Sequence, residues 1–146
     1  MDVFVFTSEN LANIWAGVGA CTWAVSQGQA ANSSIRGKAR LFAVGSLGIF
    51  YCVKPKCITT PFMVTSKPRL DEVVSHIWRD KWALPFSIVP LGTPHKRISV
   101  SALASRLPSL RGGRAWSSLL NVSPITVFAA SKLTREDWAV LVDELH

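Results

Sequence analysis

Residues 4–26 read FVFTSENLANIWAGVGACTWAVS and carry the clearest secondary-structure pattern of the chain. The beginning of this stretch is rich in Val and Phe, so we expect a strand over Asp2–Phe6. Thr7 or Ser8 offers an N-cap for the helix that follows. Apolar residues then recur at helical spacing, at Leu11, Ile14, Trp15 and Val18. The pattern predicts strand, helix and a second short strand over Cys21–Ser26, with the helical indole in the core.

Four further strands are expected in the chain after this stretch. The first two are rich in β-branched and aromatic residues. They cover Leu41–Val53, Ile58–Thr65, Leu84–Leu91 and Ser123–Ala130. Lys54, Pro55 and Lys56 turn the chain between the first two. Pro85 and Pro90 favour an edge position for the third strand, because proline cannot donate to a sheet ladder.

Two short helices are expected over Asp71–Trp78 and Ser99–Leu107. Thr134 caps a final helix, with Asp137 at the reciprocal position of a capping box. The inner face of that helix consists of Trp138, Leu141, Val142 and Leu145. Loops are expected at Gln27–Ser34 and Arg111–Arg114.

A chain of 146 residues suits one domain, spanning residues 1–146. Strands and helices do not alternate regularly, which argues against a doubly wound parallel sheet. We expect an α+β fold instead, a small mixed and partly open β-barrel of about six strands flanked by helices.

The charge is strongly basic, with 16 Lys and Arg against nine Asp and Glu and a net charge of +7. Such a field favours a polyanionic partner, because neutralising phosphates releases counterions. A basic protein without such a partner is the alternative interpretation. The candidate contacts to a nucleic-acid backbone are Arg36, Lys38, Arg40, Lys54, Lys56, Arg111 and Arg114.

Motifs for catalysis are missing from the sequence. His76, His95 and His146 form no metal-binding pair, and neither a P-loop nor a G-x-S-x-G turn is present. Three cysteines without a C-x-x-C pair suit reduced thiols in a cytoplasm. No membrane span and no secretory signal is recognisable. We therefore expect a cytoplasmic protein that is not an enzyme and uses neither a metal nor a cofactor.

Six tryptophans are the most unusual feature of the composition. Trp15 and Trp138 fall on helical faces, which is typical of core packing. Trp78 and Trp82 bracket a charged triplet, and Trp23 stands between small residues. These three indoles either close one end of the barrel or line a pocket for a flat or methylated group.

Three stretches of this chain resemble a YTH domain. They are residues 4–26, ARLFAVGSLGIFYCV at 39–53 and IWRDKWALPFSIVPLGTP at 77–94. The resemblance covers roughly residues 3–94, as read from these motifs. The wider relatives are EVE domains and the PUA-like superfamily, which share the barrel and a similar pocket.

The resemblance implies a module that binds N6-methyladenine, in RNA rather than DNA, by enclosing the flipped base in an aromatic cage. Trp23 corresponds to the first cage residue, and Trp78 and Trp82 to the rest of the cage. Asn13 would read the adenine ring, with Asn10 as the fallback. Its spacing from Ser8, at the end of the first strand, identifies Asn13 as the residue that would read the ring. The Ala24 carbonyl would accept a hydrogen bond from the remaining N6–H of the base.

Two other functions stay open on the sequence alone. The same fold reads other modified bases, such as methylcytosine in DNA, within modification-dependent restriction systems. A small enzyme or enzyme subunit acting on RNA is the third interpretation. The expected partner is methylated single-stranded nucleic acid, with a possible effector protein for the downstream response.

Overall fold

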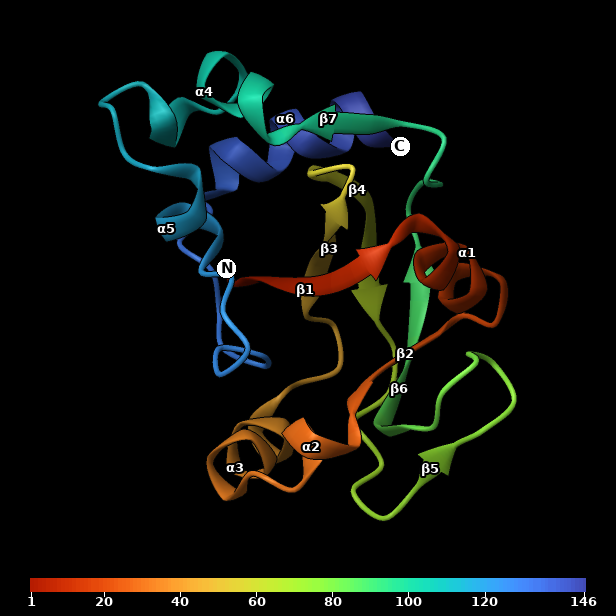
Figure 1. Ribbon diagram of the computed structural model, residues 1–146. Coiled ribbons are helices and arrows are strands. Elements are labelled where there is room, and N and C mark those ends of the chain that lie inside the picture. The colour runs from red at the N-terminus through yellow and green to blue at the C-terminus, as the bar shows by residue number, and fades with distance from the viewer.

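The computed structural model describes residues 1–146 and contains one curved sheet of seven strands (Figure 1). Its order is β1-β3-β4-β6-β2, while β5 pairs with β6 and β7 with β4. The strands are β1 (Val3–Asn10), β2 (Thr22–Ser26), β3 (Leu47–Lys54), β4 (Cys57–Val64), β5 (Val73–Val74), β6 (Trp82–Pro90) and β7 (Arg97–Ser99). β1 and β2 are the two ends of this order and do not pair, so the sheet stays open. The expected α+β class with a partly open sheet is confirmed.

Helices lie at both ends of the sheet (Figure 1). They are α1 (Leu11–Gly19), α2 (Gln27–Ala30), α3 (Ser33–Leu41), α4 (Leu103–Arg106), α5 (Trp116–Leu120) and α6 (Arg135–Leu145), with the 3-10 turns η1 (Val100–Ala102) and η2 (Pro108–Leu110). α2 and α3 lie together at one end, and α4 and α6 lie with β7 at the other (Figure 1). None of these helices has the length and apolar character needed to cross a bilayer.

The entry into α1 differs from the prediction. β1 pairs in parallel with β3 as far as Asn10 opposite Lys54, which keeps Thr7 and Ser8 extended. The N-cap is therefore Asn10, whose side chain accepts a 2.8 Å hydrogen bond from the Asn13 N–H. The predicted caps at Thr7 and Ser8 were wrong, because strand pairing outweighs a local capping preference.

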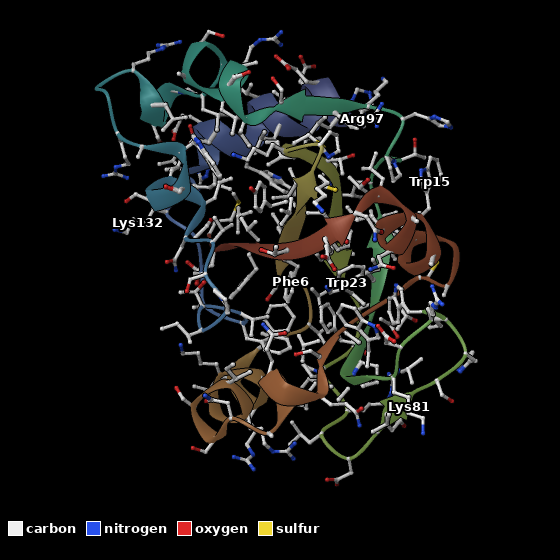
Figure 2. All side chains as sticks on the ribbon, in the orientation of Figure 1. Phe6, Trp15, Trp23, Lys81, Arg97 and Lys132 are labelled. Atoms are coloured by element: carbon white, nitrogen blue, oxygen red, sulfur yellow. The ribbon has the colours of Figure 1, made fainter.

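The inner face of α1 also differs from the prediction. Ile14 and Gly17 are its buried residues, whereas Trp15 is 40% exposed. The helix approaches β2 through Gly17, which has no side chain, so the indole two residues earlier, about 200° away around the helix axis, points outward. Figure 2 shows Trp15 at the outside of the molecule, where its ring centroid lies 4.8 Å from that of His95.

Residues 27–34 were expected to be a loop but are largely helical. Ser26 forms a capping box with Gln29 that starts α2, and the side chain of Asn32 caps α3. Because α3 continues through Leu41, the following strand begins only at Leu47.

Two other predicted elements are absent. Residues 71–78 contain the two-residue strand β5 and no helix, because Val73 and Val74 pair with β6. Residues 123–130 form turns, and their one β-bridge joins Ala130 to Phe4, while the ring of Phe128 packs on Phe6 and Phe86.

β6 is not an edge strand, since it lies between β4 and β2. It tolerates Pro85 through a bulge: Trp23 pairs with Phe86 but Val25 pairs with Ala83, so two β6 residues oppose one β2 residue. Leu84 in this bulge has a φ of 53°. The missing N–H of proline thus falls where the ladder is already interrupted.

Two hydrophobic cores lie on the two faces of the sheet. The inner core is rich in aromatic side chains and includes Phe6, Trp23 and Phe50 together with residues of α1, α2 and α3. The outer core contains Val5 and Tyr51 and the leucines of α4, α5 and α6. Side chains alternate between these cores along β1, as the pleat of a strand requires.

The last helix follows the prediction at its N-terminus, whereas only Leu141 and Leu145 of its predicted inner face are buried and Trp138 and Val142 are half-buried. Thr134 and Asp137 form the expected capping box of α6. The buried Asp137 carboxylate also accepts hydrogen bonds from the Ser109 hydroxyl at 2.5 Å and the Ser109 N–H at 3.1 Å. This carboxylate therefore joins α6 to η2 within the outer core.

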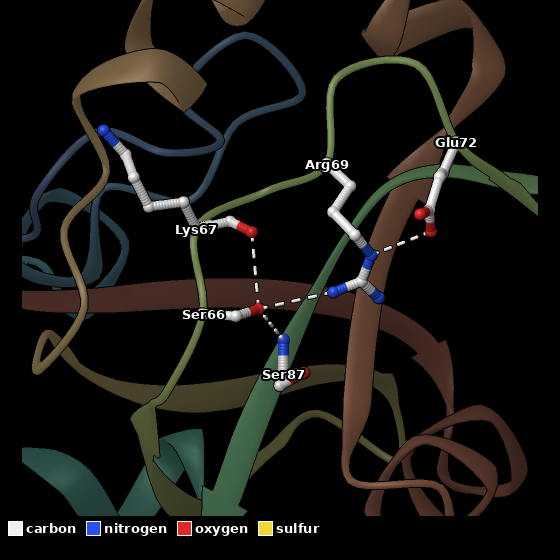
Figure 3. Close-up of polar contacts among 5 residues, drawn as sticks. All are labelled: Ser66, Lys67, Arg69, Glu72 and Ser87. Carbon is white, nitrogen blue, oxygen red and sulfur yellow. Dashed lines mark hydrogen bonds and ion pairs between the residues drawn. The ribbon is translucent and has the colours of Figure 1, made fainter.

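The loop after β4 is tied to β6 at its beginning (Figure 3). The Ser66 hydroxyl accepts a hydrogen bond from the Ser87 N–H at 2.8 Å and from Arg69 Nη1 at 3.5 Å. Arg69 also donates to the Glu72 carboxylate at 2.8 Å. Residues 75–81, further along, have no regular secondary structure.

Candidate ligand-binding cavity

The fold brings together the three indoles that the sequence singled out. Trp23 comes from β2, Trp78 from the irregular segment 75–81 and Trp82 from the first position of β6. The ring centroids lie 5.4 Å apart for Trp23 and Trp78, 6.0 Å for Trp23 and Trp82, and 5.5 Å for Trp78 and Trp82. Residues distant in sequence thus form one aromatic cluster.

These indoles pack against one another and leave no slot between them. A base stacked between two rings needs about 3.5 Å on each side, or about 7 Å in all. The observed spacings are shorter, and the rings of Trp23 and Trp78 are nearly perpendicular at 87°. The Trp78 Nε1–H also donates a 2.9 Å hydrogen bond to the Asn13 carbonyl, which holds this ring in place.

A cavity of about 540 Å³ opens beside the cluster, at the seam between the unpaired edges of β1 and β2. Its inner half, on the side of the inner core, is lined by Phe6, Trp23, Ala24, Val25, Gln29, Trp82 and Val127. Figure 2 shows Trp23 close to Phe6 in the interior. Trp23 is only 1% exposed and Trp82 is half-buried, so the second indole is the more accessible of the two.

The outer half of the cavity continues over the free edge of β1 onto the other face of the sheet. It is lined by Val5, Thr7, Tyr51, Val53 and Trp116. The rings of Tyr51 and Trp116 lie 5.3 Å apart at 45°. Burial raises the pKa of the Tyr51 phenol above its usual value, so this side chain stays neutral at physiological pH.

Residues 122–127 cover the cavity between its halves. Two contacts hold this cover to the helices at the other end of the sheet. The Gln29 side-chain amide donates to the Pro124 carbonyl at 3.0 Å, and Lys38 Nζ donates to the Ile125 carbonyl at 3.5 Å. The cover is therefore fixed to α2 and α3 and to the end of α5.

Only some of the predicted base-binding residues line this cavity. Trp23, Ala24 and Trp82 do so, and Trp78, Ser8, Asn10 and Asn13 do not. The buried Ser8 hydroxyl donates to the Asn10 carbonyl at 2.8 Å, and the Asn10 side chain caps α1.

The predicted phosphate contacts lie on three separate elements. Arg36 is half-buried on α3, where its guanidinium donates to the Ala30 and Leu70 carbonyls and lies 3.9 Å from the Asp71 carboxylate. Its role in the structure is thus partly to join α3 to the segment before β5.

Lys38 on α3 is half-buried as well, whereas the remaining predicted phosphate contacts are exposed. Arg40 is exposed at the end of α3, Lys54 and Lys56 are exposed at the turn between β3 and β4, and Arg111 and Arg114 are exposed before α5. Lys54 and Arg114 adjoin, or nearly adjoin, the cavity-lining residues Val53 and Trp116 in the chain.

Sequence reasoning missed the outer half of the cavity. Tyr51 carried no signal, since it stands within an apolar strand. Trp116 is one of six tryptophans and follows a Gly-Gly pair in a stretch without helix or strand periodicity. The sequence therefore could not show which residue its ring contacts.

Two of the three free thiols lie buried within the sheet, and Cys21 is exposed. Cys52 and Cys57 face each other across β3 and β4 and are buried. Burial raises the pKa of both thiols, for Cys57 to about 11. No group of three or more His, Cys, Asp or Glu side chains is placed to hold a metal ion.

Comparison with known proteins shows which fold this is. No family model matches the chain, and no curated protein matches its sequence. Among solved structures, the Mmi1 YTH domain matches with a TM-score of 0.59 and 13% identity, over 97% of this chain and 92% of that one.

Two further structures widen the comparison. The Toxoplasma CPSF4 YTH domain in complex with a 7-mer m6A-modified RNA has a TM-score of 0.55 and 19% identity, covering 78% of each chain. The Agrobacterium tumefaciens protein Atu2648 has a TM-score of 0.56 and 13% identity, over 98% of this chain and 92% of that one. The chain therefore has the fold of YTH domains, as the sequence resemblance implied.

Proposed function

We propose that this protein is a YTH-type reader of N6-methyladenine in RNA, which holds the methylated base in the inner half of the cavity. The observation that carries the proposal is the placement of Trp23, Ala24 and Trp82 together at an open cavity between β1 and β2. Further support comes from the Toxoplasma domain of the same fold, whose structure contains m6A-modified RNA.

The lining of the inner half suits a neutral methylated purine. Stacking of a base on an aromatic side chain contributes about 1–3 kcal/mol. Burial of the extra methyl group adds about 0.8 kcal/mol, and the van der Waals contacts of a close fit add to this. One methyl group in a hydrophobic pocket discriminates by roughly 10- to 200-fold, so we expect selectivity for the methylated base in that range.

The other residues predicted to contact the base do not line the cavity and have other roles in this proposal. Trp78 packs on Trp23 and Trp82 and supports both indoles without lining the cavity. A role for Ser8, Asn10 or Asn13 at the adenine ring would require the base to approach from α1. On that side, Trp78 is hydrogen-bonded to the Asn13 carbonyl.

The basic surface supplies affinity without base selectivity. Arg40, Lys54, Lys56, Arg111 and Arg114 are exposed and form no ion pair, so they are free to contact phosphates. For single-stranded nucleic acid, the logarithm of the affinity falls with the logarithm of salt concentration by about 0.7 per phosphate contact. We expect this slope to be the same for methylated and unmethylated RNA.

Fluorescence anisotropy with a labelled single-stranded RNA of about nine nucleotides, in methylated and unmethylated forms, tests the proposal. Trp82→Ala should abolish the preference for methylated RNA and leave the salt-dependent background. Trp15→Ala is the matched control, because it removes an exposed indole that does not line the cavity. Equal affinity of the unaltered protein for the two RNAs would refute the proposal.

Trp82 is the better position for this test than Trp23. Trp23 is 1% exposed, and truncating a buried aromatic side chain costs about 3–5 kcal/mol of stability. A loss of binding in Trp23→Ala would therefore be mixed with unfolding. The half-buried Trp82 allows a cleaner comparison.

A reader of methylated DNA is the second candidate, because stacking and methyl burial act on the base and do not distinguish ribose from deoxyribose. Single-stranded and duplex DNA with N6-methyladenine or 5-methylcytosine belong in the same assay. Tighter binding to one of these would make DNA the target. We also predict that the recovered oligonucleotides are chemically unchanged, which mass spectrometry checks.

A further inference from the structure

The cavity extends well beyond the site proposed for the methylated base. Its volume of about 540 Å³ lies within the roughly 300–1,000 Å³ typical of pockets for drug-sized ligands. The inner half contains both indoles of the proposed base site. The outer half lies across the edge of β1 and has an aromatic lining of its own.

Trp116 provides that second aromatic surface. It lies at the start of α5, and its ring is 5.3 Å from Tyr51, which is only 7% exposed beneath it. Trp116 itself is half-buried and lines the cavity. One part of the indole therefore covers the outer core, and another part faces the open space.

Two exposed cations lie close in the chain to residues that line this half of the cavity. Lys54 follows the cavity-lining Val53, and Arg114 precedes Trp116 by two residues. Both side chains are exposed, and neither forms a salt bridge. An aromatic ring beside unpaired cations is the combination by which single-stranded nucleic acids are bound, with the base stacked and the phosphate neutralised.

We propose that the outer half of the cavity is a second base subsite, in which the nucleotide adjacent to the methylated one stacks its base on Trp116. The inference rests on the proposed function, since it extends the same bound strand over the edge of β1. Stacking is tolerant of base identity, so any of the four bases fits this subsite.

The first test alters the RNA and leaves the protein unchanged. The nucleotide on either side of the methylated adenosine is replaced, one side at a time, by an abasic ribose phosphate. On one of the two sides, loss of the base should weaken binding by about 5- to 150-fold, although the phosphate remains. Unchanged affinity on both sides would refute the second subsite.

The second test assigns the effect to Trp116. In Trp116→Ala, the penalty for the abasic replacement should nearly disappear, and in Trp116→Phe it should persist in part, because phenylalanine retains a stacking ring. The preference for methylated over unmethylated RNA should survive in both variants. Trp15→Ala should show the full abasic penalty. Thermal melting checks that the variants fold, and Trp116→Phe serves where alanine destabilises the outer core.

The outcomes separate this inference from the proposed function. Failure to prefer methylated RNA in the unaltered protein would refute the function, whatever Trp116 does. A normal preference for methylated RNA, with the same abasic penalty in Trp116→Ala as in the unaltered protein, would refute only the second subsite. Loss of the preference for methylated RNA in Trp116→Phe would also contradict the second subsite, because the two halves of the cavity would then not bind separate bases.

Discussion

Gly17 of α1 and Trp23 of β2 approach so closely that no side chain fits between them. A Cβ atom on Gly17 would lie 2.8 Å from Cε3 of Trp23 and 2.9 Å from the Thr22 carbonyl oxygen. Because of this contact, α1 packs directly against the Trp23 indole, which lies at the base of the cavity. Glycine is needed here for its size, since nothing flexible lies in the path of the added atom.

We predict that Gly17→Ala destabilises the protein by about 1–3 kcal/mol, the usual cost of overpacking. Urea denaturation measures this change. Gly19→Ala, in the last turn of the same helix, is the control, because its added Cβ meets nothing within 4 Å. Equal effects of the two substitutions would show that helix propensity matters here and the contact with Trp23 does not.

Asn13→Ala tests the direction from which the base enters. Asn13 does not line the cavity, and its contact with Trp78 uses the backbone carbonyl, which alanine retains. We expect affinity for methylated RNA to change by less than about 2-fold, because no side-chain hydrogen bond to the base is lost. Isothermal titration calorimetry measures this change. A loss of about 5- to 150-fold would instead place the adenine ring against α1.

Glu9 is an exposed carboxylate on the strand that borders the outer half of the cavity. It is exposed on β1, two residues after the cavity-lining Thr7 and thus on the same face of the strand. Because this charge repels phosphates, Glu9→Gln should strengthen RNA binding by about 2- to 5-fold at low salt. The gain should shrink as salt is added.

Glu136→Gln is the matched control for Glu9, since it removes the same charge from the exposed first turn of α6. Anisotropy titrations at two salt concentrations compare the variants. An equal gain in both would show that only net charge matters, and that the outer half is not on the path of the strand.

Asp137 predicts how stability depends on pH. Burial opposes ionisation of this carboxyl, but hydrogen bonds from Ser109 and Thr134 outweigh it, so its pKa lies below the ordinary value of 3.8. A lowered pKa in the folded state contributes stability that is present above pH 3.8. That contribution disappears as the pH falls through the lowered value.

Asp137→Asn should therefore cost about 1–3 kcal/mol at neutral pH, because the Ser109 and Thr134 donors lose an acceptor. The difference from the unaltered protein should narrow in acid. Asp143→Asn, an exposed position on the same helix, should change stability little. Denaturation curves at pH 7 and pH 3 measure the differences; a pH-independent cost would mean that packing alone matters at this position.

The sequence was most informative where local rules act alone. The strand–helix–strand order of residues 4–26 and the Thr134–Asp137 capping box could be read directly, because spacing and capping chemistry determine them. The clustering of Trp23 with Trp78 and Trp82 could be expected only from the family resemblance. It depends on a loop contact between residues far apart in the chain.

Predictions failed where tertiary contacts outweigh local preference. Trp15 fits a helical apolar stripe, but α1 needs Gly17 on its buried side, and this turns the indole outward. Residues 123–130 have strand-like composition, yet they cover the cavity as turns held by Gln29 and Lys38. No local pattern could reveal these partners, because they lie more than 80 residues away in the chain.

The seam of the cavity is built by β1 and β2, whereas its cover and Trp116 come from residues 116–127. During synthesis, the first two strands leave the ribosome about a hundred residues ahead of that cover. A growing chain therefore cannot assemble the complete pocket until Val127 has emerged. Any ligand of this cavity is thus bound only after residues 116–127 have folded against the first two strands.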